Sequence, residues 1–77
     1  VKFNKPIIYL ITEGKATAEN FKNQKAKILE TVKTASENQI SLIQIREKNL
    51  SAKLVFEIAS EAAQILINTE TKLLVND

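Results

Sequence analysis

The sequence predicts an α/β fold in which three parallel β-strands alternate with two helices. Short continuous apolar runs, typical of strands, alternate with longer segments whose apolar residues recur at helical spacing. The second and third apolar runs lie about 30 residues apart, which is the length of one strand–helix–strand unit with parallel strands. The 77 residues are expected to form at most one small domain, because a chain of this size buries only a small core.

The three strands are predicted from apolar runs at residues 7–11, 40–45 and 73–75. The first run is continuous, as in strands that a parallel sheet buries on both faces. Pro6 precedes it, at a position where the missing N–H removes no ladder hydrogen bond. The chain's only glycine, Gly14, follows this strand and is interpreted as a turn residue.

Each helix is predicted from an apolar stripe whose opposite face is polar. Asn20 or Asn23 is expected to cap the first helix, and Ser51 the second. The stripe of the first helix consists of Ile28, Leu29, Val32 and Ala35. The stripe of the second consists of Leu54, Val55, Ile58, Ala59, Ala62, Ile65 and Leu66. Because crossovers between parallel strands are right-handed, both helices should cover the same face of the sheet.

The run Gln-Ile-Arg-Glu-Lys at residues 44–48 follows the second apolar stretch and contains the chain's only arginine. Side chains alternate along a strand, so Gln44, Arg46 and, if the strand continues, Lys48 share one face. If the apolar face packs on the helices, these polar side chains and Asn76 project to the other side. They then lie at the carboxyl ends of parallel strands, where α/β folds place their ligand sites.

These residue types suit an anionic ligand that carries a polar ring. Arg46 offers a planar fork for phosphate, and Lys48 adds a point charge. Asp77 is the only aspartate, and a carboxylate at a strand end is a normal ligand for Mg²⁺. The alternative is an edge strand with a solvated polar face, followed by an ordinary turn at residues 76–77. The spacing alone favours neither interpretation.

Three segments together resemble the thiamine-phosphate synthase family: Tyr-Leu-Ile-Thr at 9–12, Gln-Ile-Arg-Glu-Lys at 44–48, and Leu-Leu-Val-Asn-Asp at 73–77. Their order and spacing match along essentially the whole chain. The resemblance implies a (β/α)8 TIM barrel, of which residues 1–77 are a partial domain: the N-terminal β-α-β-α-β part with parallel strands. The chain departs from the family at residues 38–39, where glycines are frequent, and at Glu13, where the family often has Asp.

The resemblance implies a transferase of thiamine biosynthesis. It condenses hydroxymethylpyrimidine diphosphate with hydroxyethylthiazole phosphate, and the products are thiamine phosphate and diphosphate. The substrate-binding residues are expected to be Gln44, Arg46, Glu47, Lys48 and Asn76. Catalysis is assigned to Arg46 and Lys48, and Asp77 is expected to be one of two acidic Mg²⁺ ligands. The family keeps the second acidic ligand and the thiazole-phosphate site farther along the chain, so we expect residues 1–77 alone to be inactive.

Two alternatives stay open. A thiazole tautomerase-type paralogue has the same N-terminal pattern, and the sequence beyond residue 77 would separate it from a synthase. The other alternative is a non-catalytic module that binds phosphate or a protein partner. Such a module should be monomeric and cooperatively folded on its own, whereas an incomplete barrel should associate through its exposed third strand.

The amino-acid composition excludes several classes of chemistry and of partner. The chain has no cysteine and no histidine, which excludes thiolate chemistry and the commonest general base. The formal net charge is +2 with lysines interspersed among glutamates, so no nucleic-acid partner is expected. No apolar run approaches the ~18 residues of a membrane span. We expect a cytoplasmic protein whose partners are its small-molecule substrates and the remainder of the barrel, with homo-oligomerisation left open.

Overall fold

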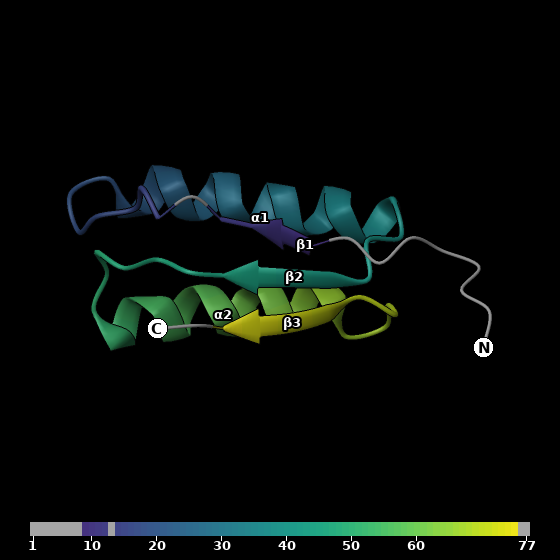
Figure 1. The fold of residues 1–77 in the computed structure, drawn as a ribbon. Helices are drawn as coiled ribbons and strands as arrows, with labels where there is room; N and C mark the ends of the chain where they lie inside the picture. The colour runs from purple at the N-terminus through teal and green to yellow at the C-terminus, as the bar shows by residue number, and fades with distance from the viewer. Residues whose placement is uncertain (1–8, 13, 76–77) are drawn as a thin grey trace.

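Three strands and two helices alternate along the chain, as the sequence predicts. The computed structural model describes residues 9–12 and 14–75. The elements are β1 (Tyr9–Ile11), α1 (Phe21–Glu37), β2 (Leu42–Ile45), α2 (Ala52–Leu66) and β3 (Lys72–Val75). The strands form one parallel sheet in the order β1-β2-β3 (Figure 1). The α/β fold with parallel strands is therefore confirmed, while residues 7 and 8 of the predicted first strand lie outside the described residues.

Both helices cover the same face of the sheet, and no helix of the described residues lies over the other, open face (Figure 1). Ile43 and Ile45 of β2 are 1% and 0% exposed and lie at the centre of the core. They pack against buried side chains of the two helices: Ile28, Val32, Ala35, Ile58, Ala62 and Leu66. The predicted stripes are thus the core-facing sides of α1 and α2. Removal of this apolar surface from water is the main force that holds the layers together.

The register of the sheet determines which side chains share its open face. Gln44 is the ladder partner of Leu74, and Ile45 is the partner of Val75. Partners in a parallel ladder project to the same side, and successive residues alternate. Gln44 and Leu74 therefore face away from the helices. The chain also leaves β2 and β3 at the same level of the sheet, because both strands end at the Ile45–Val75 pair.

The two helix caps differ in how well the sequence predicts them. Ser51 is the N-cap of α2, and its Oγ accepts a hydrogen bond from the backbone N–H of Leu54 at 3.3 Å. Asn20 is the N-cap residue of α1 but makes no capping bond. Its Oδ1 accepts instead from the backbone N–H of Thr17 at 2.6 Å. An Asn side chain can bond either to a nearby turn or to the first turn of the helix, and the Asn20 side chain bonds to the turn.

An ion-pair cluster joins α1 to α2 at the surface. Lys25 Nζ lies 2.8 Å from a carboxylate oxygen of Glu61 and 2.9 Å from one of Glu57. The hydrogen bonds to Glu61 and Glu57 raise the pKa of Lys25 above its usual 10.5. The contribution of Lys25 is therefore fully present at neutral pH and is lost as the pH rises through the raised pKa of this lysine.

Neither helix in the described part of the chain has the length and apolar character that a bilayer crossing requires.

Candidate functional site

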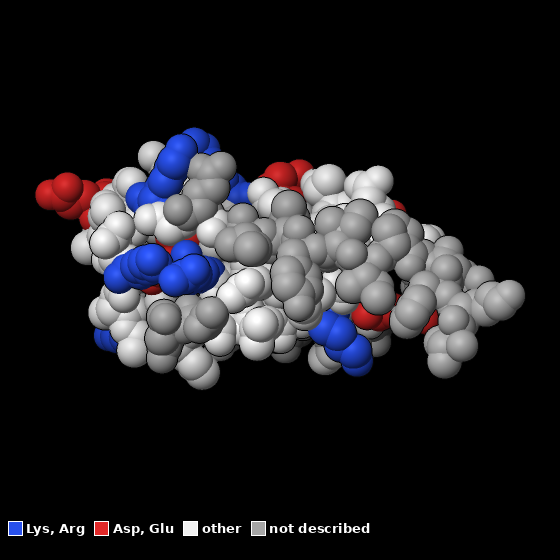
Figure 2. Space-filling view, in the orientation of Figure 1, with Lys and Arg blue, Asp and Glu red and all other residues white. Residues whose placement is uncertain are grey.

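The residues predicted to bind ligand lie at the carboxyl end of β2. Gln44 is half-buried within the strand, and Arg46 and Lys48 are exposed directly after it. In the orientation of Figure 1, Figure 2 shows basic side chains gathered over the end of the sheet to which the strand arrows point. Between the two exposed cations, Glu47 is buried and only 5% exposed. The alternation of the strand thus continues through this run after the ladder itself ends.

The loop after β1 is hydrogen-bonded to this run. The backbone N–H of Thr12 donates to the carbonyl oxygen of Gln44 at 3.2 Å. In return, the backbone N–H of Arg46 donates to Thr12 Oγ1 at 3.0 Å. These two bonds extend the contact between the first two strands past their ends. They fix the backbone of Arg46 while its side chain stays in solvent.

Glu47 makes a second set of bonds to the same loop. Its Oε2 accepts from the backbone N–H of Gly14 at 3.2 Å, and its Oε1 accepts from that of Ala16 at 3.0 Å. The family resemblance implies a substrate-binding role for Glu47, and this role stays a prediction. The alternation along β2 already contained the signal for burial, because Glu47 has the parity of Ile43 and Ile45.

Gly14 is more than a generic turn residue. Its φ of +76° is one that side-chain-bearing residues rarely adopt, and a Cβ here would meet the carbonyl oxygen of Arg46 at 3.4 Å. Its own carbonyl accepts from Asn49 Nδ2 at 3.3 Å. The 3.4 Å distance to the carbonyl oxygen of Arg46 is an ordinary van der Waals contact, so the positive φ, and not the space around residue 14, is what favours glycine at this position.

Gly14→Ala is expected to destabilise the protein by about 1–2 kcal/mol, since the left-handed conformation is unfavourable for alanine. Chemical denaturation of the variant and the parent protein measures this difference. Gly14→Asn is the matched control, because asparagine tolerates positive φ better and should lose less stability. An alanine variant as stable as the parent would mean that the loop does not hold this conformation in solution.

Asn76 and Asp77 lie outside the described residues. They follow β3 directly in the sequence, and β3 is the ladder neighbour of β2. Within residues 9–12 and 14–75, no three His, Cys, Asp or Glu side chains are grouped in a way that could hold a metal ion. The predicted roles of Asn76 and Asp77 therefore stay predictions.

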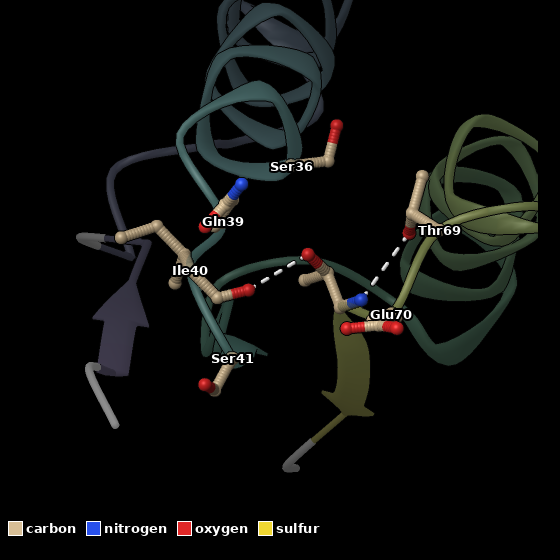
Figure 3. A pocket seen from close by; sticks show the side chains of 7 residues that line it. Ser36, Gln39, Ile40, Ser41, Thr69 and Glu70 are labelled. Carbon is tan, nitrogen blue, oxygen red and sulfur yellow. Dashed lines mark hydrogen bonds between the residues drawn. The ribbon is translucent and has the colours of Figure 1, made fainter. Parts of the chain in front are cut away.

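A hollow of about 510 Å³ lies at the amino-terminal end of the sheet, where the chain enters β2 and β3 (Figure 3). It is lined by Ser36, Gln39, Ile40, Ser41, Thr69, Glu70 and Thr71. Thr71 Oγ1 donates to the carbonyl oxygen of Ile40 at 2.7 Å, and Ser36 Oγ donates to that of Lys33 at 2.8 Å. These hydroxyls serve the connections into the strands. The hollow is separate from the carboxyl-end residues and does not compete with them as the predicted ligand site.

Comparison with known protein families gives a match over almost the whole chain. The model of the family described as thiamine monophosphate synthase matches residues 8–77. The matched stretch contains the run at 44–48 and the loop that Glu47 holds. Neither the curated proteins nor the solved structures gave a match to the chain.

Proposed function

Because the chain belongs to the thiamine monophosphate synthase family, we propose that it forms the pyrimidine-diphosphate wall of a synthase active site. The family is a TIM barrel, and the five elements correspond to its first three strands and first two helices. The proposed enzyme condenses hydroxymethylpyrimidine diphosphate with hydroxyethylthiazole phosphate and releases thiamine phosphate and diphosphate. The remainder of the barrel would supply the thiazole-phosphate site.

The arrangement at the end of β2 carries this proposal. Arg46 and Lys48 are exposed at the carboxyl end of a parallel strand, and Arg46 has its backbone fixed by Thr12. A guanidinium fork can bind two phosphate oxygens at once, and an ammonium adds charge without fixed direction. Gln44, on the open face next to them, offers an amide to the pyrimidine ring. A diphosphate ester would thus be bound at both its ends by one strand.

The same side chains fit the charge that develops during the reaction. As the bond between the pyrimidine methylene carbon and the diphosphate oxygen breaks, its electron pair stays on the leaving group. Arg46 and Lys48 would stabilise that charge where it forms. The thiazole nitrogen then supplies the electron pair for the new carbon–nitrogen bond. This chemistry needs no general base from the protein, in keeping with a chain that has no histidine.

Mg²⁺ fits the donor chemistry of the proposed site, because carboxylate oxygen is the hard ligand that this ion prefers. Asp77 would hold it, together with a second acidic residue from the rest of the barrel. The ion would neutralise charge on the diphosphate when bound. The Ile45–Val75 register supports this proposal, since the chain leaves β2 and β3 side by side.

The complete barrel, incubated with both substrates and Mg²⁺, is expected to form thiamine phosphate and diphosphate in equal amounts, detected by mass spectrometry. Chelation of the metal by EDTA should abolish turnover, and excess Mg²⁺ should restore it. Isomerisation of the thiazole phosphate without condensation would identify a tautomerase instead. Diphosphate binding with neither reaction would identify a binding module and contradict the proposed synthase.

A further inference from the structure

Glu47 has a position that substrate binding does not explain. It is charged and belongs to the same run as Arg46 and Lys48, yet its side chain is buried with 5% exposure. A buried carboxylate is costly unless hydrogen bonds compensate for lost water. Both of its oxygens have such bonds, from the backbone N–H groups of Gly14 and Ala16. Both carboxylate oxygens of Glu47 thus accept hydrogen bonds from the loop after β1.

The electrostatics of the proposed ligand argue in the same direction. A carboxylate that faced a diphosphate would repel it and would offset one of the two neighbouring cations. With Glu47 turned toward the loop, two backbone N–H groups satisfy its charge at hydrogen-bond distance. The exposed surface of the run then presents only the cations of Arg46 and Lys48. Burial of Glu47 therefore favours anion binding on the exposed side of the run, where Arg46 and Lys48 lie.

The bonds of Glu47 also constrain Arg46. The backbone N–H of Arg46 is bound by Thr12, and the next residue is anchored through its side chain to Gly14 and Ala16. The two anchors share the same loop. Neither the backbone at Arg46 nor the loop can move alone without breaking one of these bonds. A backbone segment that is fixed before binding loses less conformational freedom when the ligand arrives.

We infer that Glu47 is a positioning residue, which holds the loop after β1 against the end of β2 and so orients Arg46 and Lys48 toward the diphosphate. It contacts no substrate itself. The inference rests on the proposed function for the identity of the ligand, but the clamp between Glu47 and the loop does not depend on that identity.

Glu47→Gln in the complete barrel tests the clamp directly. Glutamine has nearly the same size but keeps only one oxygen, so its amide NH₂ would face one of the two backbone N–H donors. Hydrogen–deuterium exchange at the amides of Gly14 and Ala16 is expected to be at least about tenfold faster than in the parent protein. Glu30→Gln is the matched control, because Glu30 is exposed on α1, and it should leave both amides protected. Unchanged exchange at both amides in Glu47→Gln would overturn the clamp.

The coupling to the ligand is measured on the same variants by calorimetric titration with inorganic diphosphate in the presence of Mg²⁺. Loss of the hydrogen-bond partner behind a metal ligand typically weakens metal binding 10–100-fold. Glu47 acts on Arg46 in a comparable indirect way, and we expect about tenfold weaker diphosphate binding for Glu47→Gln. The number of diphosphate sites per chain in the titration and the KM for the thiazole phosphate should stay unchanged. A general loss of folding would instead lower the number of sites per chain. Faster amide exchange with unchanged diphosphate affinity would overturn the positioning role.

A third variant separates this inference from the proposed function. Arg46→Ala should weaken diphosphate binding yet leave the amides of Gly14 and Ala16 protected, since it removes no bond to the loop. If the barrel catalyses no condensation, the proposed synthase fails. Fast exchange in Glu47→Gln together with weaker diphosphate binding would still support the positioning role.

Discussion

The 77-residue chain on its own is expected to give no detectable thiamine phosphate when incubated with both substrates and Mg²⁺. Its described residues form three strands, whereas a barrel of this fold closes with eight. The proposed site on these residues is one wall that binds one of the two substrates. Without the opposite walls, nothing orients the thiazole nitrogen toward the pyrimidine methylene, and this orientation accounts for much of an enzyme's rate enhancement.

The same chain is expected to associate with itself, which light scattering coupled to gel filtration would measure. Leu74 and Val75 are 46% and 39% exposed on an edge strand. Phe56 of α2 is 71% exposed, and Ile67, which follows this helix, is 67% exposed. An exposed strand edge and a large apolar surface both favour association. For the turnover assay, the complete barrel incubated with the same substrates is the positive control. A monomeric chain with cooperative unfolding and measurable turnover would contradict the interpretation as part of a barrel.

Arg46→Ala in the complete barrel is expected to weaken binding of the pyrimidine diphosphate about ten- to a hundredfold. The reason is that a hydrogen bond to a charged group contributes about 1.5–3 kcal/mol. Arg46→Lys should lose less, because the charge is kept and only the bidentate fork is lost. Steady-state kinetics with each substrate varied in turn would measure both effects.

Lys33→Ala is the matched control for this change. Lys33 is an exposed cation on α1, so its removal lowers the net charge by the same amount without touching the run after β2. Its kinetics should equal those of the parent protein. Kinetics of Arg46→Ala that also equal the parent's would remove Arg46 from the site.

The element order and the core could be predicted because both depend on local periodicity. The spacing of Ile28 and Val32, and of Ile58 and Ala62, marks the helix faces that the sheet buries. The parity of β2 predicts that Ile43 and Ile45 face the helices and Gln44 faces away, and the burial pattern agrees. Ser51 caps α2 because an N-cap needs only a neighbouring backbone N–H, which the sequence itself places.

The contacts of Glu47 could not be predicted in the same way. Its partners Gly14 and Ala16 are 33 and 31 residues away, and the parallel pairing of β1 with β2 brings them within hydrogen-bond distance. The positive φ of Gly14 likewise follows from the path of the loop after β1 in the folded chain, which the sequence of the loop alone does not specify. Asn20 shows a limit for local bonds too, because it occupies the predicted N-cap position while its side chain accepts a hydrogen bond from Thr17 and makes no capping bond.

The most direct measurement is a crystal structure of the complete barrel with the pyrimidine diphosphate ester and Mg²⁺. We expect the guanidinium nitrogens of Arg46 to lie about 2.7–2.9 Å from diphosphate oxygens, with Gln44 at the ring and Glu47 still bonded to the loop. Asp77 is expected among the ligands of the ion. A diphosphate bound away from the carboxyl end of β2, with Arg46 in solvent, would contradict the account.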